Sequence, residues 1–297
     1  MGTSSAGARV SLKRVLFATD FSLSSEIVLS HALAIARRYR SKIYVAHVTP
    51  PELYKSVPHE ILKEAVEKTR EHAQHEMSHL IRLGGLRQLR HRTMLEEGDI
   101  ADVLLRLVRE HAIDLLVVGT RGHRGVKRML LGSVAEKVFR QAPCPVLIVP
   151  PPAREQVRVG RILYPTDFSQ HSLQAVPYAV SLARHYRAKL ILLHVVEGAA
   201  IHSVAELNQR RRLVKNRLKK SVLGKVKLEL KPELAVEFGE PAQRISKVAA
   251  EWQTGLIVLA VRRAKPAAAH LTEGTAYKVV RLAPCPVLTV RRRSQDA

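Results

Sequence analysis

The sequence predicts an α/β protein made of two tandem domains, each with a doubly wound, open parallel sheet. The chain has 297 residues, about twice the usual length of a single domain. It also repeats itself, because the segment from Arg14 to Ser22 matches the segment from Arg161 to Ser169 at most positions. In the first copy, short apolar runs alternate with helical patterns, which is typical of parallel strands joined by helices that cover both faces of the sheet.

A second match shows how the two copies align. The Ala-Pro-Cys-Pro-Val run around Cys144 recurs around Cys285, an offset of 141 residues, whereas the first match has an offset of 147. The second copy is therefore six residues shorter in its middle. Three prolines at 150–152 separate the copies, and proline cannot continue a sheet ladder. We therefore expect one domain at residues 1–150 and another at 151–297.

Apolar periodicity predicts the elements of the first copy. Strands are expected where short runs are mainly apolar, at 15–18, 43–48, 90–96, 115–118 and 146–149. The first helix is expected over 24–39, because its apolar residues recur on one broad face. Further helices are expected at 60–83, which is long and polar, at 100–111 and at 133–140. In this architecture ligands bind at the carboxyl ends of the strands.

The charge of the chain favours anionic partners. Lys and Arg number 49 against 26 Asp and Glu, which gives a net charge of +23 and a pI near 10.6. Such an excess attracts nucleotides, nucleic acid or acidic surfaces, but it does not choose among them, and a generally basic, solvated surface is the alternative. Aromatic residues make up only 4% of the chain, so the stacking platforms of single-strand binders are scarce.

Two classes of protein are disfavoured. The start of the chain, residues 1–8, has no apolar core typical of a signal peptide, and no apolar stretch is long enough to span a membrane, so we expect a soluble cytoplasmic protein.

Cys144 and Cys285 occupy equivalent places in two different domains. We therefore expect two buried, unreactive thiols rather than a disulfide.

A glycine-rich loop follows the strand at 115–118 and precedes the helix at 133–140. Its spacing is G-x2-G-x9-G-S, formed by Gly119, Gly122, Gly132 and Ser133. Glycines let backbone N–H groups approach phosphate oxygens, and the start of a helix adds free N–H groups and a positive dipole end. Several cations surround the same loop, namely Arg121, His123, Arg124, Lys127 and Arg128. The alternative is a mobile turn without a ligand.

These motifs resemble the universal stress protein family, twice over, at about residues 12–150 and 158–292. The resemblance rests on the loop, on the Thr-Asp-Phe-Ser end of the first strand, and on the Gly-Ser-x-Ala-Glu-Lys-Val and Ala-Pro-Cys-Pro-Val runs. It implies the Rossmann-like fold of the adenine-nucleotide alpha hydrolases and a stress-response or regulatory protein that binds ATP, with or without Mg²⁺. It also implies pairing through residues 146–149 and 287–290, so that one chain takes the place of a dimer; a homodimer of whole chains stays open.

The resemblance places the adenosine beside the ends of the first two strands and the phosphates in the loop. The chain departs from the family at Ala18, where proline is frequent; the second copy has Pro165. An alternative role for Asp20 is to cap the following helix. The cofactor-binding residues that we expect are Ala18, Thr19, Asp20, Val48, Gly119, Thr120, Arg121, Gly122, Gly132, Ser133 and Val134.

The second copy keeps the adenosine end of this pattern and loses the loop. The offset of 141 places Ala260, Arg263, Glu273 and Gly274 opposite the three glycines and Ser133. A carboxylate at 273 would repel phosphates, and a side chain at 263 would block close backbone approach. We therefore expect one nucleotide per chain, with domain 2 structural or regulatory. Thr275 and Lys265 leave the binding of a smaller anion open.

The remaining motifs leave three function classes open. His72, His75 and His79 share one helix, and we interpret them as a solvated face rather than a metal site. A basic run at 210–220 is the best candidate for contact with nucleic acid or an acidic partner, although a solvated helix is the simpler interpretation. No catalytic motif and no Walker lysine are present. The leading hypothesis is an ATP-binding stress protein; a nucleic-acid-binding or charge-mediated interaction protein and a slow ATPase are the alternatives.

Overall fold

A computed structural model describes residues 10–83, 85–120, 131–151, 157–198, 203–222, 231–261 and 274–291. The chain divides into two compact units, one covering 11–157 and the other beginning at Arg158. We call them the first and second domains and describe each by itself.

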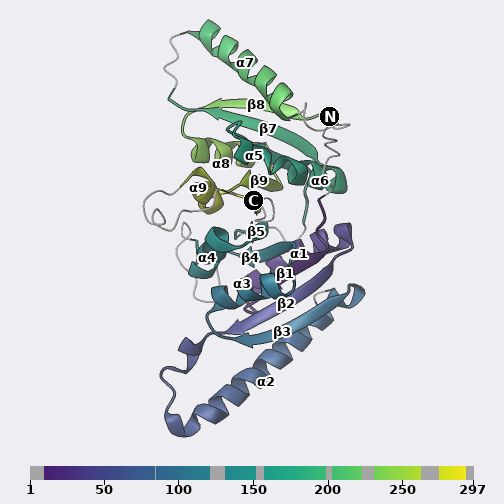
Figure 1. Ribbon diagram of the computed structural model, residues 1–297, viewed down its shortest axis with the longest axis vertical. Coiled ribbons are helices and arrows are strands. Elements are labelled where there is room, and N and C mark those ends of the chain that lie inside the picture. Colours follow the sequence, from purple (N-terminus) through teal and green to yellow (C-terminus); the bar gives the residue numbers. More distant parts are fainter. Residues whose placement is uncertain are drawn as a thin grey trace, which may run out of the picture. The chain divides into compact units, whose positions relative to one another are not determined.

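The first domain contains a five-stranded parallel sheet with the order β3-β2-β1-β4-β5 (Figure 1). Its strands are β1 (Arg14–Ala18), β2 (Lys42–Thr49), β3 (His91–Glu97), β4 (Leu115–Gly119) and β5 (Val146–Val149). All residues of β5 and nearly all of β4 are buried, as the apolar runs predict for strands covered on both faces. The predicted doubly wound α/β fold is confirmed, and each strand lies within two residues of its predicted range.

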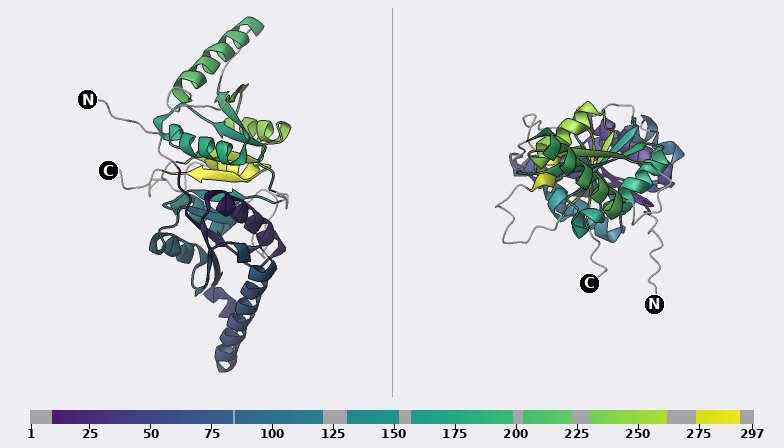
Figure 2. Two further views of the ribbon diagram at one scale, coloured as in Figure 1. Left: turned by 90° about the vertical axis from the view of Figure 1, so that its right-hand side faces the viewer. Right: turned by 90° about the horizontal axis from the view of Figure 1, so that it is seen from above.

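The helices of the first domain are α1 (Leu23–Tyr39), α2 (His59–Leu83), α3 (Ile100–Glu110) and α4 (Ser133–Gln141), with short 3₁₀ turns at Pro51–Tyr54 and Leu86–Gln88. The side chain of Ser22 caps α1 and that of Asp99 caps α3, each by accepting a backbone hydrogen bond from three residues ahead. Helix α2 lies along the β3 edge of the sheet and extends beyond it (Figures 1 and 2). Its polar sequence agrees with this exposed position.

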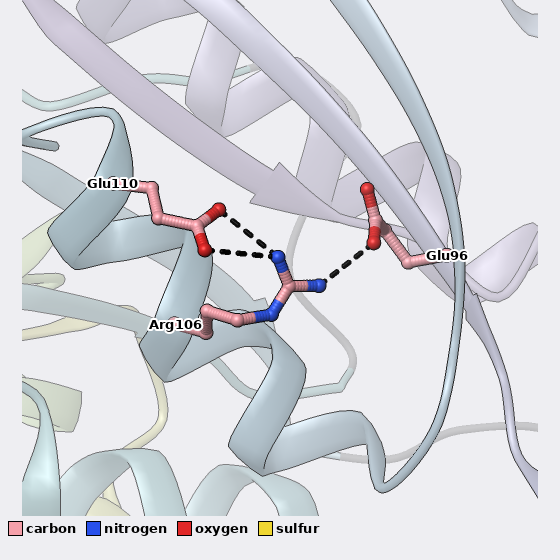
Figure 3. Close-up of polar contacts among 3 residues, drawn as sticks. All are labelled: Glu96, Arg106 and Glu110. Atoms are coloured by element: carbon pink, nitrogen blue, oxygen red, sulfur yellow. Dashed lines mark hydrogen bonds and ion pairs between the residues drawn. The ribbon is translucent and has the colours of Figure 1, made fainter.

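An exposed ion-pair network joins α3 to β3 (Figure 3). The guanidinium of Arg106 lies 3.0 Å from a carboxylate oxygen of Glu110, one helical turn away, and 2.7 Å from one of Glu96. Because all three side chains are solvated, these pairs contribute little to stability.

The second domain repeats the arrangement, with the strand order β10-β9-β6-β7-β8. Its strands are β6 (Arg161–Pro165), β7 (Lys189–Val196), β8 (Glu233–Phe238), β9 (Leu256–Ala260) and β10 (Val287–Val290). Its helices are α5 (Gln170–Leu173), α6 (Val176–Tyr186), α7 (Val204–Val222), α8 (Pro241–Glu251) and α9 (Thr275–Leu282). The counterpart of α1 is divided into α5 and α6, because Pro177 lacks a backbone N–H and stands at the start of α6 rather than inside a continuous helix.

Candidate functional site

The carboxyl ends of β1 and β4 lie side by side where the strand order of the first domain reverses. Strand β1 pairs with β4 through Phe17 opposite Val117 and with β2 through Ala18 opposite Ala46. The N–H of Thr19 then donates to the carbonyl of Ala46 at 2.9 Å. The sheet thus brings the predicted residues Thr19, Asp20, Val48 and Gly119 to one edge, the usual ligand position in open parallel sheets.

A tight network of hydrogen bonds holds the turn after β1. Asp20 Oδ1 accepts hydrogen bonds from the N–H of Ser22 at 3.1 Å and from its hydroxyl at 2.6 Å. The hydroxyl of Thr19 accepts from the N–H of Phe21 at 3.0 Å and lies 2.8 Å from that of Ser25. Ser22, not Asp20, is the N-cap of α1. The Asp20 carboxylate therefore orders the turn and, at intermediate exposure, stays at the sheet edge.

Two residues outside the predicted set shape this turn. Phe21 has a left-handed backbone with φ of 61°, and Nδ1 of His47 lies 3.0 Å from the carbonyl oxygen of Thr19. The second domain has the same pair as Phe168, with φ of 63°, and His194, whose Nδ1 lies 2.8 Å from the carbonyl oxygen of Thr166. Both pairs recur in the sequence repeat, and that recurrence is the signal that could have found them.

The start of α4 packs against the end of β4. The N–H of Gly132 donates to the carbonyl of Thr120 at 3.0 Å, and a Cβ on Gly132 would lie 3.0 Å from the same oxygen. Only glycine fits this junction without displacing backbone. Within the described segments no side chain caps α4, whereas Ser22 caps α1 and Asp99 caps α3. The first N–H groups of α4 are thus suited to an external anion.

The other predicted residues differ in exposure. Val48 and Thr120 are buried, Ala18 and Val134 are half-buried, and Ser133 is exposed in the first turn of α4. Arg121 and Gly122, together with the cations predicted up to Arg128, lie outside the described residues.

The second domain keeps the turn after its first strand. Asp167 Oδ1 accepts a hydrogen bond from the N–H of Ser169 at 2.9 Å, and Ser169 caps α5. Partial burial raises the pKa of Asp167, but hydrogen bonds from Ser169 and Ser172 outweigh this effect and leave the pKa below its usual value. The ring of Phe168 carries a further contact here, because the guanidinium of Arg217 on α7 lies 4.3 Å from its centroid.

The helix that follows the loop begins one residue later in the second domain. The offset of 141 is correct here, since Lys137 pairs with Asp99, the N-cap of α3, and Lys278 lies 4.0 Å from Glu240, the N-cap of α8. In that register Gly274 stands opposite Ser133, yet Gly274 is the N-cap and Thr275 the first helical residue. A Cβ on Gly274 would meet no atom of a described residue within 4 Å. This helix start therefore lacks the tight packing that Gly132 has, while Arg263 and Glu273 fall outside the described residues.

Other predicted features can be placed as well. His72, His75 and His79 are exposed on α2, and the described residues contain no group of three or more side chains arranged to hold a metal ion. Cys144 and Cys285 are both buried, and neither forms a disulfide within the described segments. Within the described segments, no helix is long and apolar enough to cross a membrane.

Comparison with known proteins agrees with this architecture. The model of the universal stress protein family matches residues 11–150 and 158–291. A universal stress protein of Methanocaldococcus jannaschii is 31% identical over 144 residues, which cover 48% of this chain and 85% of the relative. A Staphylococcus aureus relative is 28% identical over 145 residues, covering 47% and 85%.

Among solved structures, a universal stress protein from Archaeoglobus fulgidus shares the fold over 94% of this chain and 98% of its own, with a TM-score of 0.68 and 21% identity. A Pseudomonas aeruginosa protein of unknown function covers 96% and 95%, with a TM-score of 0.65 and 16% identity. Two family matches in tandem account for nearly the whole chain. The protein therefore belongs to the universal stress protein family, and this membership supports a role in the stress response.

Proposed function

We propose that the first domain binds ATP at the carboxyl edge of β1 and β4. The observation that carries the proposal is the start of α4, where backbone N–H groups that no described side chain caps lie at the point at which the strand order reverses. Donors of this kind favour phosphate groups, because hydrogen bonds and the helix dipole act in the same direction. Family membership supports a nucleotide over a simple anion.

Four of the predicted residues have side chains with a chemical task in this proposal. The Asp20 carboxylate, ordered by Ser22, accepts hydrogen bonds from ribose hydroxyls. The apolar side chains of Ala18 and Val48 flank the adenine. The hydroxyl of Ser133 and the first N–H groups of α4 donate to phosphate oxygens. A Mg²⁺ ion bound with the nucleotide would neutralise part of the phosphate charge.

The second domain has a different role in this proposal. It keeps the Thr166–Asp167 turn. Its helix α9, however, begins one residue later than α4 does, and no described atom packs against Gly274 at the start of α9. In addition, Arg217 stacks on Phe168 next to that turn. We therefore assign one nucleotide to each chain and a structural or regulatory role to the second domain.

A matched pair of variants tests the assignment. In calorimetric titration of the whole chain, we expect one ATP per chain. Ser133→Glu places a negative charge among the phosphates and should weaken ATP by roughly tenfold or more, because like charges repel in a partly desolvated site. Thr275→Glu makes the same change in the second domain and should leave the affinity unchanged. Glutamate is favourable in a first helical turn, so both variants should fold.

Three results would overturn the assignment: no measurable ATP binding, two ATP molecules per chain, or equal loss in the two variants. Phosphate release can be followed in the same samples. Release above background that disappears in Ser133→Glu would identify the slow ATPase.

A further inference from the structure

Helices α2 and α7 occupy equivalent places in the two domains, but α2 is nearly balanced in charge and α7 is strongly basic. In α2, five Glu residues are interspersed with Lys63, Lys68, Arg70 and Arg82. Helix α7 has a single acidic residue, Glu206, which pairs with Arg210 at 2.7 Å. The other basic residues of α7 are Arg211, Arg212, Lys215, Arg217, Lys219 and Lys220. Helix α7 thus has a net charge of +6, from seven basic residues and one acidic residue, whereas α2 has a net charge of −1.

Apolar burial and two aromatic contacts anchor α7 to its domain. Leu218 and Val222 are fully buried against the domain. Arg211 lies over the ring of Phe238 at 5.7 Å, and Arg217 lies over that of Phe168 at 4.3 Å. These two guanidiniums hold the helix through cation–π contacts and through packing of their apolar stems.

The remaining cations form an exposed group that we call the α7 cation stripe. It consists of Arg212, Lys215, Lys219 and Lys220. All four side chains are exposed, and none makes an ion pair with a residue in the described segments. Helix α7 lies along the β8 edge of its own sheet and extends beyond it (Figures 1 and 2), so the stripe is accessible to a large partner.

We propose that the α7 cation stripe binds the phosphate backbone of double-stranded nucleic acid, independently of sequence. At 1.5 Å per residue the stripe spans about 12 Å, which covers several phosphates because each strand of a duplex carries one phosphate per roughly 3.4 Å. Arg and Lys on one helix face are the usual source of such contacts.

The composition of α7 favours a duplex over single-stranded nucleic acid and over a lipid surface. It contains no aromatic residue, so it offers no platform on which unpaired bases could stack. Its exposed apolar residues Val204 and Leu213 are nine positions apart and thus on opposite sides of the helix. It therefore lacks the apolar face with which amphipathic helices enter a lipid surface.

Fluorescence anisotropy of the full chain with a labelled mixed-sequence DNA duplex tests the proposal. The same measurement with an RNA duplex shows whether the stripe binds DNA, RNA or both. With four phosphate contacts, the logarithm of the binding constant should fall with the logarithm of salt concentration with a slope of roughly −3 to −4. Between about 50 and 200 mM salt this is roughly a hundredfold loss of affinity.

Two triple variants of equal charge provide the decisive comparison. Replacing Arg212, Lys215 and Lys219 by Gln should reduce the slope to about −1 and weaken binding by roughly tenfold or more at 0.1 M salt. Replacing Lys63, Lys68 and Arg70 on α2 by Gln removes one Arg and two Lys as well and should leave slope and affinity nearly unchanged. Glutamine is a good helix former, and circular dichroism of both variants checks that each helix is retained.

Equal weakening by the two triple variants would overturn the proposal, because it would assign binding to the net charge of the chain. A wild-type slope near zero would also overturn it. The same holds if vesicles rich in phosphatidylserine bind through the stripe while neither duplex does. The assay contains no nucleotide, so its outcome is independent of ATP binding by the first domain.

Discussion

The rings of Phe21 and His47 are stacked, with centroids 4.4 Å apart and planes inclined by 28°. The stack supports a phenylalanine in a left-handed conformation that L-residues seldom adopt, and His47 also contacts the carbonyl of Thr19. Asp20 lies between Thr19 and Phe21 in the chain. The orientation of its carboxylate therefore depends on a side chain from the neighbouring strand. Phe168 and His194 form the equivalent contact at 4.4 Å in the second domain.

We predict that His47→Leu weakens ATP binding by roughly fivefold, because loss of a hydrogen bond of about 1 kcal/mol loosens the turn that presents Asp20. The equivalent change His194→Leu should leave ATP affinity unchanged while reducing thermal stability to a similar degree. Calorimetric titration and thermal unfolding of both variants measure these effects. If His194→Leu weakened ATP binding and His47→Leu did not, the nucleotide would lie in the second domain.

The buried imidazole of His31 makes stability depend on pH. Burial lowers its pKa from 6.5 to about 4, and its Nε2 has no hydrogen-bond partner among the described residues. The folded state therefore favours the neutral ring. Between pH 6.5 and 4 the unfolded chain binds the proton and the folded chain does not, so this contribution is complete above pH 6.5 and is lost as the pH falls. The loss reaches about 3 kcal/mol.

Urea unfolding at several pH values measures this dependence. His31→Leu removes both the titration and the unpaired nitrogen, so the variant should lose less stability than the wild type between pH 7 and 4. The exposed His75 serves as the control position, and His75→Leu should retain the wild-type profile. Parallel pH profiles for wild type and His31→Leu would show that another group is responsible.

Gly255 stands where the second domain has no room for a side chain. A Cβ there would lie 2.5 Å from the carbonyl oxygen of Arg158 and 2.8 Å from the Cα of Val159. Because these are backbone atoms, Gly255→Ala should cost about 1 to 3 kcal/mol in free energy of unfolding. Gly160→Ala is the control, since a Cβ there meets nothing within 4 Å. The free energies of unfolding of the two variants, measured with denaturant, should differ by at least about 1 kcal/mol.

The two cysteines should be unreactive in the folded protein. Burial raises the pKa of Cys285 to about 12, and Cys144 is 3% exposed. A thiol needs access and its thiolate form to react, so both should resist a thiol-specific reagent at pH 8 until denaturant is added. Rapid labelling of either cysteine in the native chain, followed by mass spectrometry of the labelled peptide, would contradict this prediction.

The sequence by itself determined the number of repeats, the order of their elements and the residues at the sheet edge. Apolar runs and helical periodicity are local signals, so β1, β4 and α4 could be placed within two residues, and the internal repeat showed which positions correspond. The resemblance to the universal stress protein family implied that Thr19, Asp20, Gly132 and Ser133 belong to one nucleotide site, and this stays a prediction.

Only the tertiary structure decided how these residues are held. Ser22, not Asp20, caps α1. His47 contacts the carbonyl of Thr19, which lies 28 residues away in the chain. In the second domain, the guanidinium of Arg217 on α7 lies over the ring of Phe168. The single-residue delay of α9 relative to α4 also became visible only in space. Periodicity reports which face of an element is buried, but it carries no information about which side chain of a distant element meets that face. Contacts between distant segments depend on the packing of the whole domain, and this packing distinguishes the two copies of one repeat.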